Sequence, residues 1–364
     1  MKRHRLLILK NHMSLGGAET LILQHVKHLN RDVFDVHVIT LTKEGTLLED
    51  LAKHADVYEC FDVRFHFSPL SLIRLAWYIR SNKIDLVHCH DWVSALYLVL
   101  SSSRSNARRV LTIHAKLRSW RQNVLSYLVK HFDLIISVTR QQQLSFFELG
   151  APWEKLAVVH NCIDSERFPL RRRTVSDKTG AANRVVMVGN FYWQKDQMTL
   201  VEAVRVLSQR GCDLELHLVG GSNDENLEAC KARVRDLDLE ARVFFHGQER
   251  VHSEFLSSFD LFTFSSRSEQ FGIVILEAMA SGLPVLVSDI PASMEVIGHG
   301  RYGFFFETGN VESCAREIGE LLVDPSRLGS KTEDALEYVQ SFTSEVITRK
   351  LEERYLRLLS ESLG

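Results

Sequence analysis

The sequence predicts an α/β protein built from two Rossmann-like, doubly wound domains. Two observations support this prediction. Short apolar runs alternate with helical segments along most of the chain, as expected for βα units on a parallel sheet. The chain also has 364 residues, which is more than one hydrophobic core usually accommodates. We therefore expect two parallel sheets, each covered by helices.

The apolar runs give the expected strands of each half. In the first half they lie at residues 6–9, 36–41, 86–88, 110–113 and 134–138. In the second half they lie at residues 185–188, 214–219, 243–245, 261–264 and 285–287.

The expected domain boundaries follow from changes in this pattern. Residues 1–166 form an N-terminal domain, and residues 167–184 form a polar linker without a helical or strand period. Residues 185–344 form a C-terminal domain. The last segment, residues 345–364, contains the amphipathic stretch LEERYLRLLSESL. We expect it to be a helix that packs back toward the N-terminal domain.

Composition excludes several classes of protein. With 45% hydrophobic and 25% charged residues and a net charge of -2, the chain is neither disordered nor a typical nucleic-acid binder. Its six cysteines include no CxxC pair, which favours a reducing, cytoplasmic location. The basic N-terminus followed by a four-residue apolar run predicts a first strand rather than a signal peptide. No apolar run is long enough to span a bilayer, so any membrane contact would be peripheral.

The C-terminal half contains the most informative segment, SSRSEQFGIVILEAMASGLPVLVSD. Ligands of open α/β sheets bind beyond the carboxyl ends of the strands. Here a strand ends, Glu269 and Gln270 follow, and a helix starts near Gly272 with Glu277 further along it. The amides of three residues at that helix start, Phe271, Gly272 and Ile273, predict a diphosphate site. The alternative is that both acids are merely solvated.

Lys195 is the expected cation for this site. It stands in VMVGNFYWQKDQM, where a strand leads through a glycine turn to the start of a helix. A lysine there can neutralise phosphate charge as a sugar departs. The alternative is an ordinary surface lysine.

The N-terminal half contains weaker signals. Gly16 and Gly17 follow the first strand, where they would permit a tight turn and a close backbone approach to a ligand, or simply turn the chain. His88 and His90 share a strand face, but no third metal ligand is evident. We therefore predict no metal site, and we regard His114, at the end of another strand, as the better site candidate.

Together these segments resemble the retaining glycosyltransferases of family 4, often called glycosyl transferases group 1, which have the GT-B architecture. The resemblance covers nearly the whole chain. It rests on GGAE at 16–19, DLVHCHDWVS at 85–94, TIHA at 112–115, NCID at 161–164, and, in the second half, VGN, LVGG, FFHG, EAMASGLPV and YGFFFETGN.

The resemblance implies two domains facing a cleft, with the acceptor bound by the N-terminal domain and the nucleotide-sugar bound by the C-terminal domain. It also assigns roles to several residues. Glu277 would bind the donor ribose, and Glu269 the hydroxyls of the transferred sugar. Lys195 would bind the diphosphate, which Gly17 would approach from the other domain. His114 would line the sugar site.

The resemblance also implies that the donor is a UDP- or GDP-linked sugar, with neither a metal nor another cofactor. The DxD string at 236–238 lies in a polar helical pattern, and we expect it to face solvent. Two departures affect the donor side. Asn190 stands where many members carry an arginine, so that Lys195 would act alone or with Arg267, and Gln270 replaces a usual glycine.

The expected activity is metal-independent, retaining transfer of a sugar to an acceptor hydroxyl, on a saccharide or lipid-linked saccharide of cell-surface glycan synthesis. The basic amphipathic segments at 64–83 and 115–132 indicate either contact with an anionic membrane, at the inner face of the plasma membrane, or helices that face the core. The alternative functions are a nucleotide-sugar 2-epimerase, a phosphorylase, and an inert nucleotide-sugar-binding protein.

Overall fold

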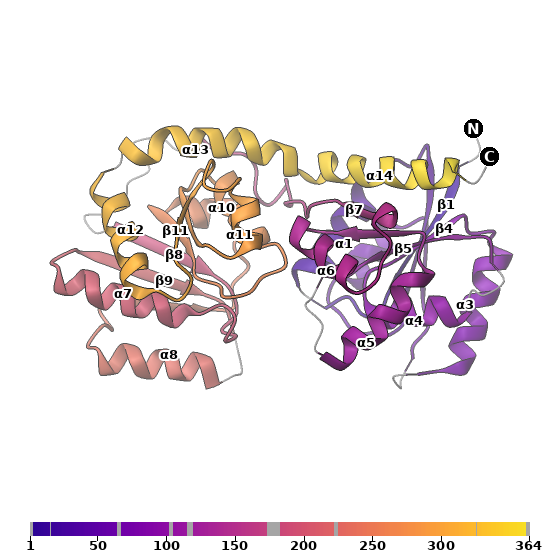
Figure 1. Cartoon of the computed structure of the whole chain (residues 1–364), viewed down its shortest axis with the longest axis horizontal. Helices are drawn as coiled ribbons and strands as arrows, with labels where there is room; N and C mark the ends of the chain where they lie inside the picture. The colour runs from indigo at the N-terminus through magenta and orange to yellow at the C-terminus, as the bar shows by residue number, and fades with distance from the viewer. Residues whose placement is uncertain are drawn as a thin grey trace. The chain divides into compact units, whose positions relative to one another are not determined.

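The computed structural model describes residues 3–14, 16–63, 67–101, 105–114, 119–172, 183–221, 225–324 and 326–361. The chain divides into two compact units (Figure 1). Unit 1 comprises Met1–Asp164 together with Ser344–Gly364, and unit 2 comprises Ser165–Thr343. The C-terminal helix therefore belongs to the first unit.

Unit 1 contains a parallel sheet in the order β3-β2-β1-β4-β5-β6-β7. Its strands are β1 (His4–Lys10), β2 (Phe34–Thr40), β3 (Val57–Cys60), β4 (Leu86–Cys89), β5 (Arg108–Thr112), β6 (Leu134–Ser137) and β7 (Leu156–Val158). Its helices are α1 (Gly17–His28), α2 (Leu48–His54), α3 (Pro69–Ser81), α4 (Trp92–Ser101), α5 (Ser119–Leu128), α6 (Arg140–Glu148) and α14 (Ser344–Ser360), with short 3-10 helices at Val129–His131 and Trp153–Lys155.

Unit 2 contains a second parallel sheet in the order β10-β9-β8-β11-β12-β13. Its strands are β8 (Asn183–Val188), β9 (Leu214–Val219), β10 (Val243–Gly247), β11 (Leu261–Phe264), β12 (Val285–Ser288) and β13 (Phe304–Phe306). Its helices are α7 (Gln197–Gln209), α8 (Glu225–Asp236), α9 (Ser253–Ser257), α10 (Ile273–Ala280), α11 (Pro291–Val296), α12 (Val311–Val323) and α13 (Ser326–Val339), followed by a 3-10 helix at Gln340–Phe342.

The two doubly wound sheets confirm the predicted fold class, and each predicted apolar run overlaps a strand. The linker differs at its edges. Strand β8 already begins at Asn183, and Phe168 is fully buried while the Arg167 carbonyl accepts a hydrogen bond from the Ser253 amide. Residues 173–182 of the predicted linker, and residues 64–66 and 115–118 of the two basic segments, lie outside the described residues.

Helix α14 packs on α1 and on the sheet of unit 1 through buried polar contacts. The Tyr355 hydroxyl lies 2.6 Å from His88 Nδ1, and Thr348 Oγ1 lies 2.9 Å from His25 Nδ1. Buried polar groups are costly unless they are paired. These pairs therefore fix the position of the returning helix on unit 1 as well as burying its apolar face.

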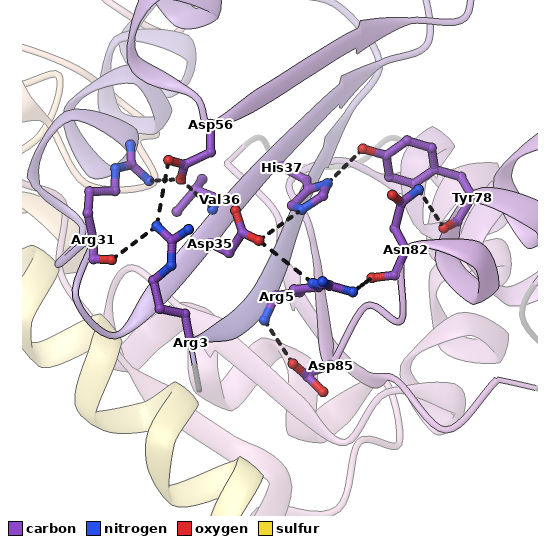
Figure 2. Close-up of polar contacts among 10 residues, drawn as sticks. All are labelled: Arg3, Arg5, Arg31, Asp35, Val36, His37, Asp56, Tyr78, Asn82 and Asp85. Carbon is purple, nitrogen blue, oxygen red and sulfur yellow. Dashed lines mark hydrogen bonds and ion pairs between the residues drawn. The ribbon is translucent and has the colours of Figure 1, made fainter. Parts of the chain in front are cut away.

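A polar network joins the amino-terminal ends of β1, β2 and β4 (Figure 2). The Arg5 amide donates to Asp85 Oδ2 at 2.8 Å, and the Val36 amide donates to Asp56 Oδ2 at 2.7 Å. His37 Nδ1 lies 2.7 Å from the Tyr78 hydroxyl on α3. These groups lie at the opposite ends of the strands from the carboxyl edge where ligands of such sheets bind. We therefore assign the network to stability.

Each sheet has a topological switch point, which is the place between two neighbouring strands where the strand order reverses. The connections that follow these two strands run to opposite sides of the sheet. In unit 1 it lies between β1 and β4, and in unit 2 between β8 and β11. Crevices form beyond the carboxyl ends of the strands at such points. The loops that follow these four strands are therefore where side chains for chemistry are expected.

The buried histidine that supports α14 predicts sensitivity to acid. Burial, reinforced by His28, lowers the pKa of His25 to about 4, from an ordinary value of about 6.5 when unfolded. Between these values the unfolded chain binds more protons, so the free energy of unfolding falls as pH falls from about 6.5 to about 4. We expect His25→Gln, which does not titrate, to lose about 2 kcal/mol less stability than wild type between pH 7 and pH 4.5. Urea unfolding at the two pH values checks this, and equal losses would contradict it.

Candidate active site

Lys195 and Glu269 meet at the switch point of unit 2. Lys195 lies in the loop after β8, Glu269 lies in the loop after β11, and Lys195 Nζ forms a hydrogen-bonded ion pair with Glu269 Oε2. Their side chains remain 22% and 20% exposed, respectively. The pair is thus partly sheltered yet accessible to a ligand, and it joins the two residues that the sequence predicted for the phosphate and the sugar.

The loop that carries Lys195 is held on several sides. Lys195 Nζ lies 4.9 Å from the ring centroid of Phe264, which favours a cation. Ser265 Oγ donates to the carbonyls of Lys195 and Asp196 at 3.1 and 2.8 Å. Gln197 Nε2 donates to the Gly189 carbonyl at 3.0 Å. The sequence analysis missed Ser265 and Gln197, because nothing in their spacing distinguishes them from ordinary polar residues.

Arg267 supports this loop. Its Nε lies 2.8 Å from Asp196 Oδ2, and its amide donates to the Gln194 carbonyl at 2.7 Å. Its guanidinium packs on Gly309, where a Cβ would come within 2.9 Å of Nη1. Arg267 therefore holds this loop through Asp196, and its role as a second phosphate cation stays a prediction.

Asn190 lies in the same loop, and its side chain is exposed. Asn190 Oδ1 accepts a hydrogen bond from the Gly221 amide at 3.1 Å. Gly220, which precedes Gly221, has φ +151°, and a Cβ at this position would lie 2.2 Å from the Gly189 carbonyl oxygen. The loops after β8 and β9 thus pack backbone to backbone, and Asn190 connects them. Its Nδ2 group is the part suited to donate to a ligand.

Helix α10 begins directly after Glu269. Gly272, its N-cap, has φ +90°, a conformation that favours glycine, and the Gln270 amide donates to Glu269 Oε1 at 3.2 Å. Phe271 is buried with its ring 6.3 Å from that of Phe342, so only its backbone is suited to a ligand. Ile273 is the first helical residue, and the partly buried Glu277 is the fifth.

In unit 1 the switch point contains an ion cluster that the sequence analysis missed. Lys10 Nζ, at the end of β1, lies 3.2 Å from Glu19 Oε1 and 3.7 Å from Asp91 Oδ2. Asp91 Oδ2 also accepts a hydrogen bond from the Asn11 amide at 2.8 Å. The lysine side chain is only 7% exposed. A charged residue ending an apolar run was the available signal.

The ion cluster gives Gly16 a second role, besides the turn that the sequence predicted. Gly16 is the N-cap of α1 with φ -162°, which is extended backbone that any residue adopts. A Cβ at Gly16 would lie 2.6 Å from Glu19 Oε2, so a larger residue there would displace the carboxylate that pairs with Lys10. Gly17, the first residue of α1, is exposed.

His114 ends a row of histidines that follows β4 and β5. His90 Nδ1 lies 3.2 Å from His114 Nε2, and the two rings are stacked with centroids 5.5 Å apart. His88 uses both ring nitrogens, on Tyr355 and on Thr112 Oγ1 at 2.8 Å, so it is structural.

Burial keeps the ring of His114 neutral. Desolvation, with the charge of Lys10 adding to it, lowers the pKa of His114 to about 3. His114 Nδ1 is buried, and no group among the described residues hydrogen-bonds to it. A neutral imidazole with one unpartnered nitrogen suits a contact to a sugar hydroxyl.

The predicted DxD string is divided by the end of a helix, since Asp236 is the last residue of α8 and Asp238 has φ +53°. Within the described ranges, no three His, Cys, Asp or Glu side chains are grouped to hold a metal ion. Nor does any described helix have the length and apolar character needed to cross a bilayer.

Comparison with known protein families identifies the family to which the chain belongs. Residues 15–167 match the family model "Glycosyltransferase Family 4", and residues 171–339 match "Glycosyl transferases group 1". The chain belongs to glycosyltransferase family 4. It is a GT-B enzyme of the hexosyltransferase class, as the sequence predicted.

Individual relatives agree with this assignment. The chain is 26% identical over 371 residues to N-acetyl-alpha-D-glucosaminyl L-malate synthase of Bacillus anthracis, with 96% of each chain covered. It is 31% identical to the lipopolysaccharide core biosynthesis glycosyltransferase LpsE of Rhizobium meliloti, over 65% of this chain and 66% of that one.

Solved structures share the fold at lower identity. A glycosyltransferase from Rickettsia africae matches with a TM-score of 0.84 and 20% identity, and 99% of each chain is covered. HepE of Anabaena, in complex with UDP and glucose, matches with a TM-score of 0.81 and 22% identity, covering 98% of this chain and 100% of that one.

Proposed function

We propose that this glycosyltransferase transfers a sugar from a UDP-linked donor to a saccharide hydroxyl, with retention of the anomeric configuration and without a metal ion. The observation that carries the proposal is the meeting of Lys195 and Glu269 at the switch point of unit 2. UDP is favoured over GDP because HepE of Anabaena, which has the same fold, binds UDP and UDP-glucose.

In this proposal each group acts on one part of the donor. Lys195 donates to the diphosphate, aided by the amides at the start of α10, and Glu269 accepts hydrogen bonds from hydroxyls of the transferred sugar. Glu277 binds the ribose. Lysine has three N–H donors, so Lys195 can hold Glu269 and a phosphate oxygen together.

The proposed reaction is assisted by the leaving group. The bond between the anomeric carbon and the phosphate oxygen breaks as the acceptor oxygen attacks from the same face, and the acceptor proton passes to the departing phosphate. Lys195 stabilises the negative charge that develops on that phosphate. His114 contacts the sugar through Nδ1 and stays neutral, because burial depresses its pKa.

We further propose a lipid-linked acceptor at an anionic membrane, on the evidence of α3. Leu70, Ile73 and Trp77 lie on one face of this helix and are 80, 67 and 65% exposed, whereas Leu75 and Ile79 are buried. The helix contains no acidic residue and includes Arg80 and Arg74, the latter paired with Glu59 of β3 at 2.8 Å. Exposed large apolar side chains with flanking cations suit an interface that contains anionic lipid.

Removing a donor contact should abolish most of the transfer. We expect Lys195→Ala and Glu277→Ala each to lower kcat/KM about a hundredfold, because a lost charge contact to the donor removes transition-state stabilisation. The measurement is transfer from UDP-linked sugars to octyl glycosides, with and without EDTA. Lys231→Ala, which removes a surface lysine paired with Glu228 in α8, is the matched control.

Circular dichroism confirms that the variants are folded. Wild-type rates for a folded Lys195→Ala protein, or loss of wild-type transfer on adding EDTA, would refute the proposed roles. The product distinguishes the alternative enzymes, because an epimerase converts the donor without an acceptor and a phosphorylase requires free phosphate. Nuclear magnetic resonance of the product reports whether the configuration is retained.

The exposed face of α3 should mediate membrane binding. We expect the wild-type protein to sediment with vesicles containing phosphatidylglycerol but not with pure phosphatidylcholine, and Ile73→Ser/Trp77→Ser to reduce sedimentation about tenfold. The matched control is Leu144→Ser/Phe147→Ser, which removes two half-exposed apolar side chains of α6. Equal sedimentation of both double variants would contradict a specific role for α3.

A further inference from the structure

Two exposed aromatic side chains lie in the loop that carries Lys195. Trp193 and Tyr192 are 64 and 48% exposed, whereas Phe191, directly before them, is buried. In the described part of the chain, neither exposed ring packs against another aromatic ring. The family assignment gives these two residues no role, and core packing does not explain them either.

The backbone beneath these rings is firmly held. The Lys195 amide donates to the Tyr192 carbonyl at 2.9 Å, which closes a turn with Trp193 and Gln194 at its corners. The Tyr192 amide donates to the Asn190 carbonyl at 2.8 Å. Phe191 anchors the start of the loop, with its ring 5.9 Å from that of Phe245. A rigid loop presenting exposed rings loses little conformational entropy when a ligand packs on them.

The place of these two residues in the chain indicates which part of the substrates they meet. Trp193 precedes Lys195 by two residues, so their Cα atoms are at most about 7.6 Å apart. Lys195 and Glu269 mark the sugar end of the donor in the proposed function, and Glu277 the nucleoside end. The acceptor must approach the sugar end, where the bond forms.

From these observations we propose that Trp193 and Tyr192 form a stacking platform for a pyranose ring of the acceptor. One face of a pyranose is lined with C–H bonds, which pack on the faces of aromatic rings, and large aromatic side chains supply much contact area. Gln194, which directly follows Trp193, has an amide side chain suited to bind its hydroxyls. This inference rests on the proposed function and adds how the acceptor is recognised.

The test is a comparison of the wild-type chain with Trp193→Ala, Trp193→Phe and Tyr192→Ala. We expect Trp193→Ala to raise the KM for an octyl glycoside acceptor about tenfold, as truncation of a buried anchor does, with little change in kcat. Trp193→Phe should restore part of the affinity, and Tyr192→Ala should have a smaller effect. Donor affinity, measured by calorimetry, should stay within about twofold of wild type for every variant.

Trp153→Ala is the matched control, since Trp153 is half-exposed in unit 1 and contacts only Phe147 in the aromatic pairs described. A second readout does not require turnover. In the presence of UDP, octyl glycosides of glucose, galactose, mannose and N-acetylglucosamine are titrated while tryptophan fluorescence is recorded. We expect at least one glycoside to change the wild-type emission, and the change to vanish in Trp193→Phe.

The outcomes separate the two hypotheses. Absence of transfer with every donor and acceptor refutes the proposed function, whereas the fluorescence titration still tests the platform. An unchanged acceptor KM in Trp193→Ala, a loss of donor affinity instead, or no fluorescence response to any of the four glycosides would overturn the platform.

Discussion

The ion pair between Lys195 and Glu269 is the interaction on which the account of this enzyme depends. It joins the loops after β8 and β11, which diverge at the switch point of the unit 2 sheet. Each loop contains a residue with a positive φ next to or near the ion-paired group. Asp196 follows Lys195 in one loop, and Gly272, a residue type that tolerates this conformation, follows Glu269 in the other. The carboxylate and the ammonium thus reach the same place from two different loops, and the pair combines an acceptor suited to hydroxyls with a cation suited to a phosphate.

Unit 1 contains a related arrangement with a different purpose. Lys10 also lies at a switch point, but two carboxylates neutralise it and its side chain is 7% exposed, against 22% for Lys195. A buried ion cluster of this kind is costly to break, because the remaining charges would be left unpaired. Lys10 therefore helps to hold together the segments that follow the carboxyl ends of β1 and β4. Its charge also helps to keep His114 neutral. The same residue type at equivalent places of two sheets is structural in one and suited to chemistry in the other.

The central strands of both sheets could be predicted from sequence because they are buried on both faces and consist of continuous apolar runs. The strands β3, β7 and β13 were missed. All three are edge strands of only three or four residues, and β3 has no buried residue, so each is too short for its pattern to predict a strand. Lys195 and Glu269 were predicted because they directly follow central strands. The cluster of Lys10 was missed because its burial depends on pairing between β1 and β4, which are far apart in sequence.

The choice of Gly16 could not be explained from sequence for a similar reason. Glycine there suggested a turn, whereas the structure shows that it makes room for the side chain of Glu19. Arg267 likewise was singled out only as a cation for the phosphate, whereas the structure shows that it also pairs with Asp196. In both cases the residue type indicated that the position is special. The structural role of the residue, however, depends on a side chain that the sequence pattern does not show to be in contact with it.

The most direct test of the account is calorimetric binding of the active nucleotide-sugar and of its nucleoside diphosphate to wild type, Lys195→Ala and Glu269→Gln. Lys195→Ala should weaken binding of both ligands, because both contain the diphosphate. Glu269→Gln should weaken only the nucleotide-sugar, by about tenfold, because only that ligand offers sugar hydroxyls to the carboxylate. If Glu269→Gln weakens both ligands equally, or neither, the assignment of the sugar to Glu269 and of the diphosphate to Lys195 is wrong.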